Sequence, residues 1–376
     1  MPLSRRSFLR GMGAGATAAV VTPPLSREYL LAPTEPFRTT QPGGPVLLNG
    51  NENAYGQFPS VVEAMQRALP YCNRYPYKEW DRLTATIAER HSIGAEQVLL
   101  GNGSTELLRI CAQAFTGPGK KLIVPVPTYE SLGRYAQAFG AEIIPVPLTK
   151  DFAHDLDAML RSTDSSTGLV YICNPNNPTA SLTPRGDIET FIAKLPPTTS
   201  VLIDEAYFHF ANGGTGYSSF IGHHDRRVIT IRTFSKVYGL AGLRLGYGVS
   251  TKETIKRLKP YQLEDTLNMV AVRCAVTALE DDAALGAAAS RNANDRSEFI
   301  RQASSRGISP IPSYANFLMF DTHRPIKEVI SYFEKNNVIV GRPFPPMDTY
   351  MRISLGLPGE MREFWRVWDQ MAPARG

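Results

Sequence analysis

Short apolar runs alternate with amphipathic stretches through the central part of the chain. The runs are rich in Val, Ile and Leu at successive positions, which is typical of strands buried on both faces of a parallel sheet. They occupy residues 97–100, 121–124, 142–146, 169–173, 201–203 and 228–231. Amphipathic stretches at 105–115 and 129–139 predict helices between them. We therefore predict an α/β fold in which a mostly parallel sheet is flanked by helices on both sides.

The C-terminal part has a different pattern. A long polar helix is predicted at about 282–306, followed by apolar segments at 314–320 and 338–340. A last helix is predicted near 360–370. This mixture of elements predicts a second, smaller α+β domain.

The chain divides into four parts on these patterns. We predict a large domain at 71–274 and a small domain made of 46–70 and 275–376. Residues 26–45 are rich in Pro, Gly and Thr and predict an extended arm. Residues 1–25 have the features of a leader.

That leader begins with a cluster of arginines. Arg5-Arg6 and Arg10 precede a mild apolar stretch at 11–21, and the first 27 residues contain no acid. The order Arg-Arg-x-Phe-Leu resembles the twin-arginine export signal. We expect export to the periplasm or the medium by that pathway; the alternative is a basic tail.

Composition indicates a globular protein of enzyme size, with 376 residues of which 43% are hydrophobic and 20% charged. Three positive charges belong to the leader, so the formal charge of +5 falls to +2 without it. So weak a balance predicts neither a nucleic-acid surface nor stable membrane association. No apolar run has the length of a bilayer span.

Cysteine and histidine spacing predicts no metal site. The four cysteines contain no C-x-x-C pair. Cys111 and Cys173 lie in apolar segments, which favours buried free thiols. We interpret His223-His224 as a solvated loop, because no further histidine stands at ligand spacing.

A glycine-rich turn follows the first predicted strand. Gly101-Asn102-Gly103-Ser104-Thr105-Glu106 opens a predicted helix. Glycines let the backbone approach an anion, Ser104 is placed to cap the helix, and exposed N–H groups bind phosphate. Such a turn is often only a turn, so it is informative together with the motifs below.

Two later strands also end in polar groups. Asp204 ends one strand, and Tyr207 follows three residues later. A carboxylate at this position is suited to hold a heterocyclic nitrogen protonated, although strand-ending acids are common. Because ligands of open α/β sheets bind beyond the carboxyl ends of the strands, these groups are expected to lie close together.

Lys236 follows the next strand and is preceded by Ser235, with Arg244 eight residues beyond it. A lysine in this setting is typical of an amine that forms a Schiff base with a carbonyl. Ser235 and Arg244 then complete a phosphate-binding cup, because the guanidinium fork matches phosphate geometry. A surface lysine is the alternative.

The order of these motifs resembles a known family. The run Asn174-Pro175-Asn176-Asn177-Pro178-Thr179, the pair Asp204 and Tyr207, Ser235-Lys236 and Gly242-Leu243-Arg244 resemble fold-type I pyridoxal-phosphate (PLP) aminotransferases of class I/II. The segments at 48–56 and 74–76 resemble the histidinol-phosphate aminotransferase branch. The resemblance covers about residues 45–370.

The resemblance implies a role for each matching residue on the cofactor side. Lys236 would form the Schiff base with PLP and move the proton at the substrate α-carbon. Asp204 would pair with the pyridine nitrogen, Tyr207 and Asn177 would contact the ring's phenolic oxygen, and Tyr129 would stack on the ring. The phosphate would be held by Gly103, Ser104, Thr105, Ser235 and Arg244.

The same resemblance implies a substrate side and a partner. Arg352 would bind the substrate's anion, Arg342 a second anion, and Asn53 would also contact the substrate. Tyr75 would reach the cofactor phosphate from the other subunit of a homodimer. Two positions depart from the family pattern, because Ala54 stands where proline is usual and Ala180 where glycine is usual.

Three functions are compatible with these residues. The first is a PLP-dependent aminotransferase that uses histidinol phosphate or an aromatic amino acid as donor and a 2-oxo acid as acceptor. The second is a PLP lyase or decarboxylase acting on a (phosphorylated) amino acid, which shares the cofactor chemistry. The third is a cofactor-binding protein without turnover, which the presence of Lys236, Asp204, Tyr207 and Arg244 disfavours. An export leader favours a donor outside cytoplasmic histidine synthesis.

Overall fold

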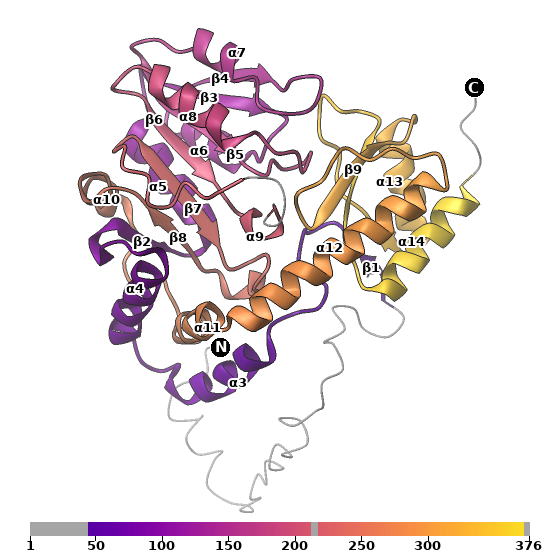
Figure 1. Ribbon diagram of the computed structural model, residues 1–376, viewed down its shortest axis with the longest axis horizontal. Coiled ribbons are helices and arrows are strands. Elements are labelled where there is room, and N and C mark those ends of the chain that lie inside the picture. The colour runs from indigo at the N-terminus through magenta and orange to yellow at the C-terminus, as the bar shows by residue number, and fades with distance from the viewer. Residues whose placement is uncertain (1–43, 212–216, 372–376) are drawn as a thin grey trace, which may run out of the picture. The chain divides into compact units, whose positions relative to one another are not determined.

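A seven-stranded sheet is the centre of the protein in the computed structural model, which describes residues 44–211 and 217–371 (Figure 1). The strand order is β2-β8-β7-β6-β5-β3-β4. Only β8 runs against the other six strands, as its antiparallel pairing with β2 and β7 shows. The strands are β2 (Val98–Gly101), β3 (Lys121–Val126), β4 (Glu142–Pro147), β5 (Thr167–Cys173), β6 (Ser200–Asp204), β7 (Val228–Thr233) and β8 (Gly246–Val249).

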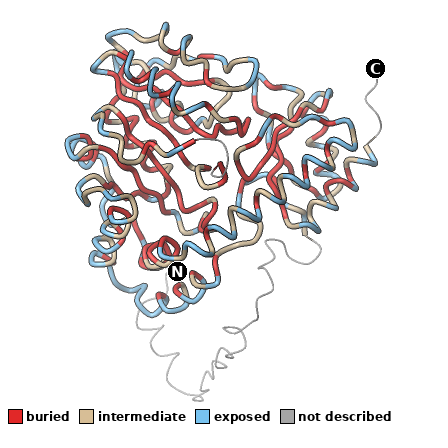
Figure 2. The backbone as a smooth tube through the Cα atoms, in the orientation of Figure 1, coloured by how far each residue is buried: buried red, intermediate tan, exposed pale blue. Residues whose placement is uncertain are grey.

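Helices cover both faces of this sheet because successive side chains of its strands enter two different cores. Leu122 and Val124 of β3 pack with α5 and α6, whereas Ile123 between them packs with α7 and α8. Figure 2 shows the resulting run of buried positions along the strands. The helices on these faces are α5 (Gly103–Phe115), α6 (Ser131–Ala138), α7 (Leu156–Arg161), α8 (Arg185–Lys194) and α10 (Lys252–Leu258).

A third core lies at the β2–β8 edge of the sheet. Here α3 (Pro59–Ala68), α4 (Tyr77–His91) and α11 (Met269–Glu280) pack together around residues such as Val61, Leu83 and Val272. The short α9 (Phe208–Ala211) follows β6. Four 3₁₀ turns complete this part of the described chain, at Leu69–Tyr71, Ala95–Gln97, Ala241–Leu243 and Lys259–Tyr261.

The C-terminal elements form a smaller α+β region. Helix α12 (Asp282–Ser304) runs from α11 to this region, where α13 (Ile326–Lys335) and α14 (Pro358–Gln370) lie beside it (Figure 1). Strands β9 (Phe317–Asp321) and β11 (Tyr350–Ser354) pair antiparallel, and β1 (Val46–Leu47) pairs in parallel with β10 (Val338–Ile339). An aromatic core that includes Phe299, Phe333 and Phe364 joins the three helices.

The observed elements confirm the predicted α/β class with its mostly parallel sheet. All six predicted strands of the large sheet are present, and none of their ends is shifted by more than two residues. Strands β1, β8 and β11 were not predicted. The described residues all belong to one compact unit, so the proposed boundary between a large and a small domain stays a prediction. The predicted leader and nearly all of the arm lie outside the described residues.

Within the described part of the chain, no helix is long and apolar enough to cross a membrane. The same residues contain no group of three or more histidine, cysteine or acidic side chains placed to hold a metal ion. Cys111, Cys173 and Cys274 are buried free thiols, and Cys72 is an exposed one. Burial raises the pKa of the Cys111 thiol to about 12.

Candidate active site

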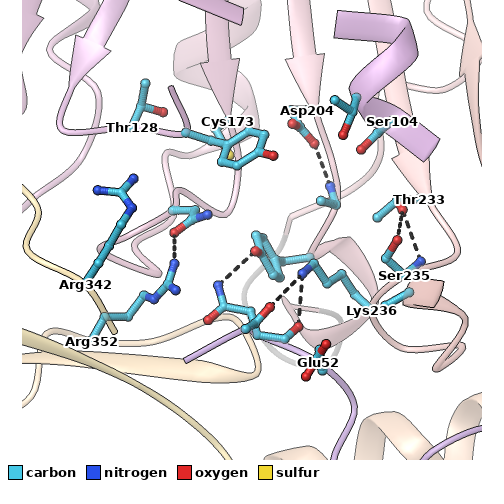
Figure 3. Close-up of a pocket in the computed structure, with 18 of the residues that line it drawn as sticks. Glu52, Ser104, Thr128, Cys173, Asp204, Thr233, Ser235, Lys236, Arg342 and Arg352 are labelled. Atoms are coloured by element: carbon cyan, nitrogen blue, oxygen red, sulfur yellow. Dashed lines mark hydrogen bonds between the residues drawn. The ribbon is translucent and has the colours of Figure 1, made fainter. Parts of the chain in front are cut away.

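A cavity of about 300 Å³ lies at the carboxyl ends of β5, β6 and β7. The C-terminal region supplies its other wall through β11 and the segment after β10. Figure 3 shows how side chains from both walls point into it. It is lined by eleven of the predicted site residues, namely Ser104, Thr105, Tyr129, Asn177, Asp204, Tyr207, Ser235, Lys236, Arg244, Arg342 and Arg352.

Lys236 follows β7 and enters the cavity from the sheet side. Its Nζ donates to the backbone oxygens of Asn51, at 3.1 Å, and Gly50, at 3.4 Å. Burial and the positive charge of Arg352 lower the pKa of Lys236 to about 8. The lysine therefore has a larger neutral, nucleophilic fraction at neutral pH than a solvated lysine has.

Asp204 ends β6 and is 3% exposed. Its Oδ2 accepts a hydrogen bond from the Tyr171 hydroxyl at 2.9 Å, and its Oδ1 accepts one from the Ala206 amide at 3.0 Å. Burial raises the pKa of Asp204 to about 6, against the lowering effect of these hydrogen bonds. A cationic partner in the cavity would compensate this buried carboxylate and favour its charged form.

Asn51 connects the two walls near Lys236. Its side-chain amide donates to the Tyr207 hydroxyl at 3.0 Å, and its backbone N–H donates to Ser354 Oγ at 2.9 Å. Asn51 has a φ of 52°, a left-handed conformation that asparagine tolerates better than most residues. The phenol of Tyr207 is thereby held on the cavity wall, where it packs edge-on against Phe317.

A cup of polar groups surrounds the start of α5. Gly103 has a φ of +73°, and a Cβ at this position would collide with the Arg244 guanidinium. Arg244 also reaches Ser235 Oγ at 3.4 Å, while Ser104 and Thr105 line the same side of the cavity. The expectation that Ser104 caps the helix is wrong, because α5 begins at Gly103 with Asn102 as its N-cap residue. Ser104 is therefore available to a ligand.

Two arginines on the C-terminal wall, Arg342 and Arg352, both lie over the ring of Phe344. Arg352 is 8% exposed and donates to Asn177 Oδ1 at 2.7 Å and to the Asn49 oxygen at 2.6 Å. Its Nε is buried without a hydrogen-bond partner among the described residues. Burial and the charge of Arg342 lower the pKa of Arg352 to about 10. An anion in the cavity would satisfy this guanidinium.

Three predicted site residues do not line the cavity. Gly103 lies just behind it and contributes by lacking a side chain. Asn53 donates its side-chain amide to the Val237 oxygen at 2.9 Å and lines a separate, smaller pocket. Tyr75 is 66% exposed on the outer surface, stacked on Tyr77.

Several residues with a place in the site were not singled out from the sequence. Glu52, Thr128 and Phe344 line the cavity, and Tyr171 lies behind it as the hydrogen-bond donor to Asp204. The continuous apolar run of β5 carried a signal for Tyr171, because a phenol in a strand buried on both faces needs a hydrogen-bond partner. The glutamate and the threonine had no such signal.

A buried ion pair next to Asp204 was also missed. Glu205 accepts from the Arg232 guanidinium at 2.9 and 3.1 Å, and both side chains are almost fully buried. The guanidinium lies 3.9 Å from the centre of the Phe208 ring. The pair compensates the charge of Glu205, which does not line the cavity, so β6 and the residue after it present only the Asp204 carboxylate there.

These groups fit PLP. The cup of Gly103, Ser104, Ser235 and Arg244 is suited to a phosphate, and the absent Cβ of Gly103 is what keeps it open. Asp204 is a buried carboxylate for a ring nitrogen, and Lys236 is an amine with a lowered pKa for the aldehyde. The cavity therefore offers a suitable group to the phosphate, the ring nitrogen and the aldehyde of that cofactor.

Comparison with known proteins agrees with this assignment. The profile of the family "Aminotransferase class I and II" matches residues 44–366. The histidinol-phosphate aminotransferase of Moorella thermoacetica is 33% identical over 97% of each chain. An aromatic amino acid aminotransferase of Cutibacterium acnes is 36% identical over 74% of this chain and 79% of its own.

A solved structure also superposes closely. It is the histidinol-phosphate aminotransferase of Sinorhizobium meliloti in complex with pyridoxal-5'-phosphate, with 26% identity and a TM-score of 0.81. The match covers 87% of this chain and 91% of that one. The protein described here therefore belongs to the aminotransferase class I and II family, as a PLP-dependent enzyme of fold type I.

Proposed function

We propose that the enzyme takes its amino group from histidinol phosphate or an aromatic amino acid and passes it to a 2-oxo acid. The observation that carries this proposal is the pair of arginines at the cavity, one buried and one at the mouth, which both lie over the ring of Phe344. Guanidinium groups suit a carboxylate or phosphate, and an aromatic ring beside them suits an aromatic side chain. Relatives of both donor types, described above, support the same choice.

The protein's residues divide the work of the reaction. PLP, when bound, supplies an electron sink for the carbanion. With the cofactor in place, Lys236 would move the proton at the substrate α-carbon, and Asp204 would favour a positive charge at the ring nitrogen. Arg352 orients the donor by its carboxylate or phosphate, and Asn177 holds that guanidinium in place through their 2.7 Å hydrogen bond. Tyr207, held by Asn51, presents its hydroxyl to the cavity, where it would contact the cofactor ring.

The test is a half-reaction on the purified holoenzyme. Histidinol phosphate and aromatic, aliphatic and acidic amino acids are added singly, and the cofactor absorbance is followed for loss of the lysine-bound form. We expect conversion by histidinol phosphate, by an aromatic amino acid, or by both. Conversion only by acidic or aliphatic amino acids would contradict the proposed donor class.

The alternative of a lyase or decarboxylase has less support, because the relatives compared above are aminotransferases by name. The same experiment separates the two. Release of carbon dioxide or ammonia, without a matching amino-acid product from the 2-oxo acid, would replace the transaminase by that alternative.

A homodimer with Tyr75 at its interface is part of this proposal. Tyr71, Tyr75 and Tyr77 are about half or more exposed, which is a large aromatic surface for a region of this size. A second copy of the chain would cover it. Light scattering is expected to give the mass of two chains, and Tyr75→Ala is expected to weaken PLP affinity. A monomeric protein, or unchanged PLP affinity in the variant, would contradict the shared site.

Export is proposed on the sequence of residues 1–25 alone. The paired arginines Arg5 and Arg6 are the feature that supports it. Fractionation of cells that make the full chain, compared with Arg5→Lys/Arg6→Lys, measures this directly. Accumulation outside the cytoplasm that depends on both arginines is expected. Equal cytoplasmic retention of both proteins would remove the proposal.

A further inference from the structure

Arg342, at the mouth of the cavity, has a charged partner that Arg352 lacks. Its Nη2 lies 2.8 Å from Glu130 Oε2, and the two side chains are 50% and 47% exposed. Arg352 has only neutral hydrogen-bond partners, so its charge remains available to a substrate. The two arginines are therefore unequal anion sites, although both lie over the ring of Phe344.

The ion pair joins the two walls of the cavity. Glu130 precedes α6 on the sheet side, directly after Tyr129, which lines the cavity. Arg342 follows β10 on the C-terminal side and lines the cavity itself (Figure 3). The carboxylate thus holds Arg342 from the outer side of the mouth. A distal anion of a bound donor would have to displace or share this carboxylate.

Because the Glu130–Arg342 ion pair is half-exposed, an anion of the substrate can replace Glu130 at Arg342 at little cost. Ion pairs between half-exposed side chains contribute little, because water screens them and both side chains lose freedom. A phosphate carries more charge than the carboxylate and competes for the guanidinium, yet it also meets repulsion from Glu130 at close range. A neutral aromatic donor meets neither effect.

From this geometry we infer that Glu130 is a specificity-determining residue: it occupies Arg342 and reduces the enzyme's preference for donors with a distal phosphate over neutral aromatic donors. The inference rests on the proposed function, because it takes Arg342 to face the donor's distal group. Glu130 acts through Arg342 and does not touch the reacting atoms.

The test is a set of variants of the holoenzyme, namely Glu130→Gln, Arg342→Met and the double variant. For each, half-reactions give kcat/KM for histidinol phosphate and for phenylalanine, and calorimetry gives the affinity for inorganic phosphate. E130Q is expected to raise the ratio of the two kcat/KM values, and the phosphate affinity, by about threefold to tenfold. R342M is expected to lower both.

The double variant decides whether Glu130 acts through Arg342. We expect its kcat/KM ratio and phosphate affinity to match those of R342M. Removal of Glu130 can strengthen phosphate binding only if the Arg342 guanidinium is present to be released. Glu189→Gln is the matched control: it removes a carboxylate of 44% exposure that pairs with Arg185 at 2.8 Å on α8. It should leave the ratio and the phosphate affinity as in the wild type.

Two outcomes would overturn the inference. One is an E130Q variant that unfolds at the wild-type temperature and shows the wild-type phosphate affinity and the wild-type ratio of the two kcat/KM values. The other is the same gain in the R342M background as in the wild type. If no donor is converted by the wild type, the proposed function fails instead, while the phosphate affinities still report whether Glu130 occupies Arg342.

Discussion

The two walls of the cavity differ in how firmly they hold their functional groups. On the sheet wall, Asp204 is buried and fixed by two hydrogen bonds from Tyr171 and Ala206. On the C-terminal wall, Arg342 is half-exposed and is held by an ion pair with Glu130, a hydrogen bond to the adjacent Pro343 oxygen and a contact with the Phe344 ring. Arg352 is intermediate, since it belongs to the C-terminal wall but is buried against Asn177 of the sheet wall.

This difference indicates that the sheet wall carries out the reaction chemistry and that the mouth of the cavity selects the amino donor. Groups that are held by burial and several hydrogen bonds need no reorganisation during the reaction. Groups at an exposed mouth can exchange partners at little cost. The sheet wall is therefore suited to one cofactor and one set of proton movements, whereas the mouth is suited to adjustment between donors.

The largest effect is expected at the centre of the sheet wall. Lys236→Ala removes the amine that we propose moves the proton, so transamination should fall by at least about 10³-fold. Fold and assembly should remain, as judged by circular dichroism and light scattering. Lys327→Ala, on a helix outside the cavity, is the control. Multiple turnovers by the Lys236 variant would refute the role of the lysine.

The buried arginine is expected to matter more than the exposed one. Arg352→Ala should cost about 1.5–3 kcal/mol in kcat/KM, the scale of a hydrogen bond to a charged group. Arg342→Ala should cost less than about 1 kcal/mol for a neutral aromatic donor, because its charge is already compensated. Steady-state kinetics with phenylalanine measure both. Equal losses would break the contrast between buried and exposed anion sites.

Tyr171 tests whether the hydrogen bonds behind the cavity matter. Tyr171→Phe removes the donor that lowers the pKa of Asp204, so that pKa should rise further above its present value of about 6. Protonated Asp204 cannot hold a positive ring nitrogen, so activity should be lost at a higher pH as the solution is acidified. We expect a decrease of about tenfold in kcat at neutral pH. A pH–rate profile with an unshifted acidic limb would exclude this role.

Much of the sheet wall could be predicted from the sequence, because its groups follow buried strands. Asp204 and Lys236 stand directly after apolar runs, and parallel strands bring such ends together. Strand β8 escaped prediction because Gly246 and Gly248 weaken its apolar pattern. A Cβ on Gly246 would collide with the start of α5, so this close contact requires glycine in place of a typical strand residue.

The mouth of the cavity was harder to predict. Glu130 and Arg342 are far apart in the sequence and belong to elements whose contact depends on the whole fold. An exposed glutamate ahead of a helix is also common, so nothing in its local pattern indicates a partner. Tyr171 and Arg232 were missed for a related reason, because their partners lie on neighbouring strands.

Ala180 is the one departure from the family pattern that the structure explains. Its φ is 59°, the left-handed region in which glycine is favoured, and it is fully buried in the loop after β5. Its amide donates to the Asn176 oxygen and its oxygen accepts from the Tyr314 amide, both at 2.8 Å. The loop is therefore held in this conformation from both sides, in spite of the alanine.

The smallest effect follows from this position. Ala180→Gly relieves about 1–2 kcal/mol of backbone strain, but it adds freedom to the unfolded chain and removes a buried methyl group. These effects nearly cancel, so the free energy of unfolding should change by less than about 1 kcal/mol. Ala287→Gly, at an exposed position inside α12, should destabilise by about 1 kcal/mol in the same urea titrations. A loss at Ala180 as large as that at Ala287 would mean that the backbone at Ala180 stores no strain.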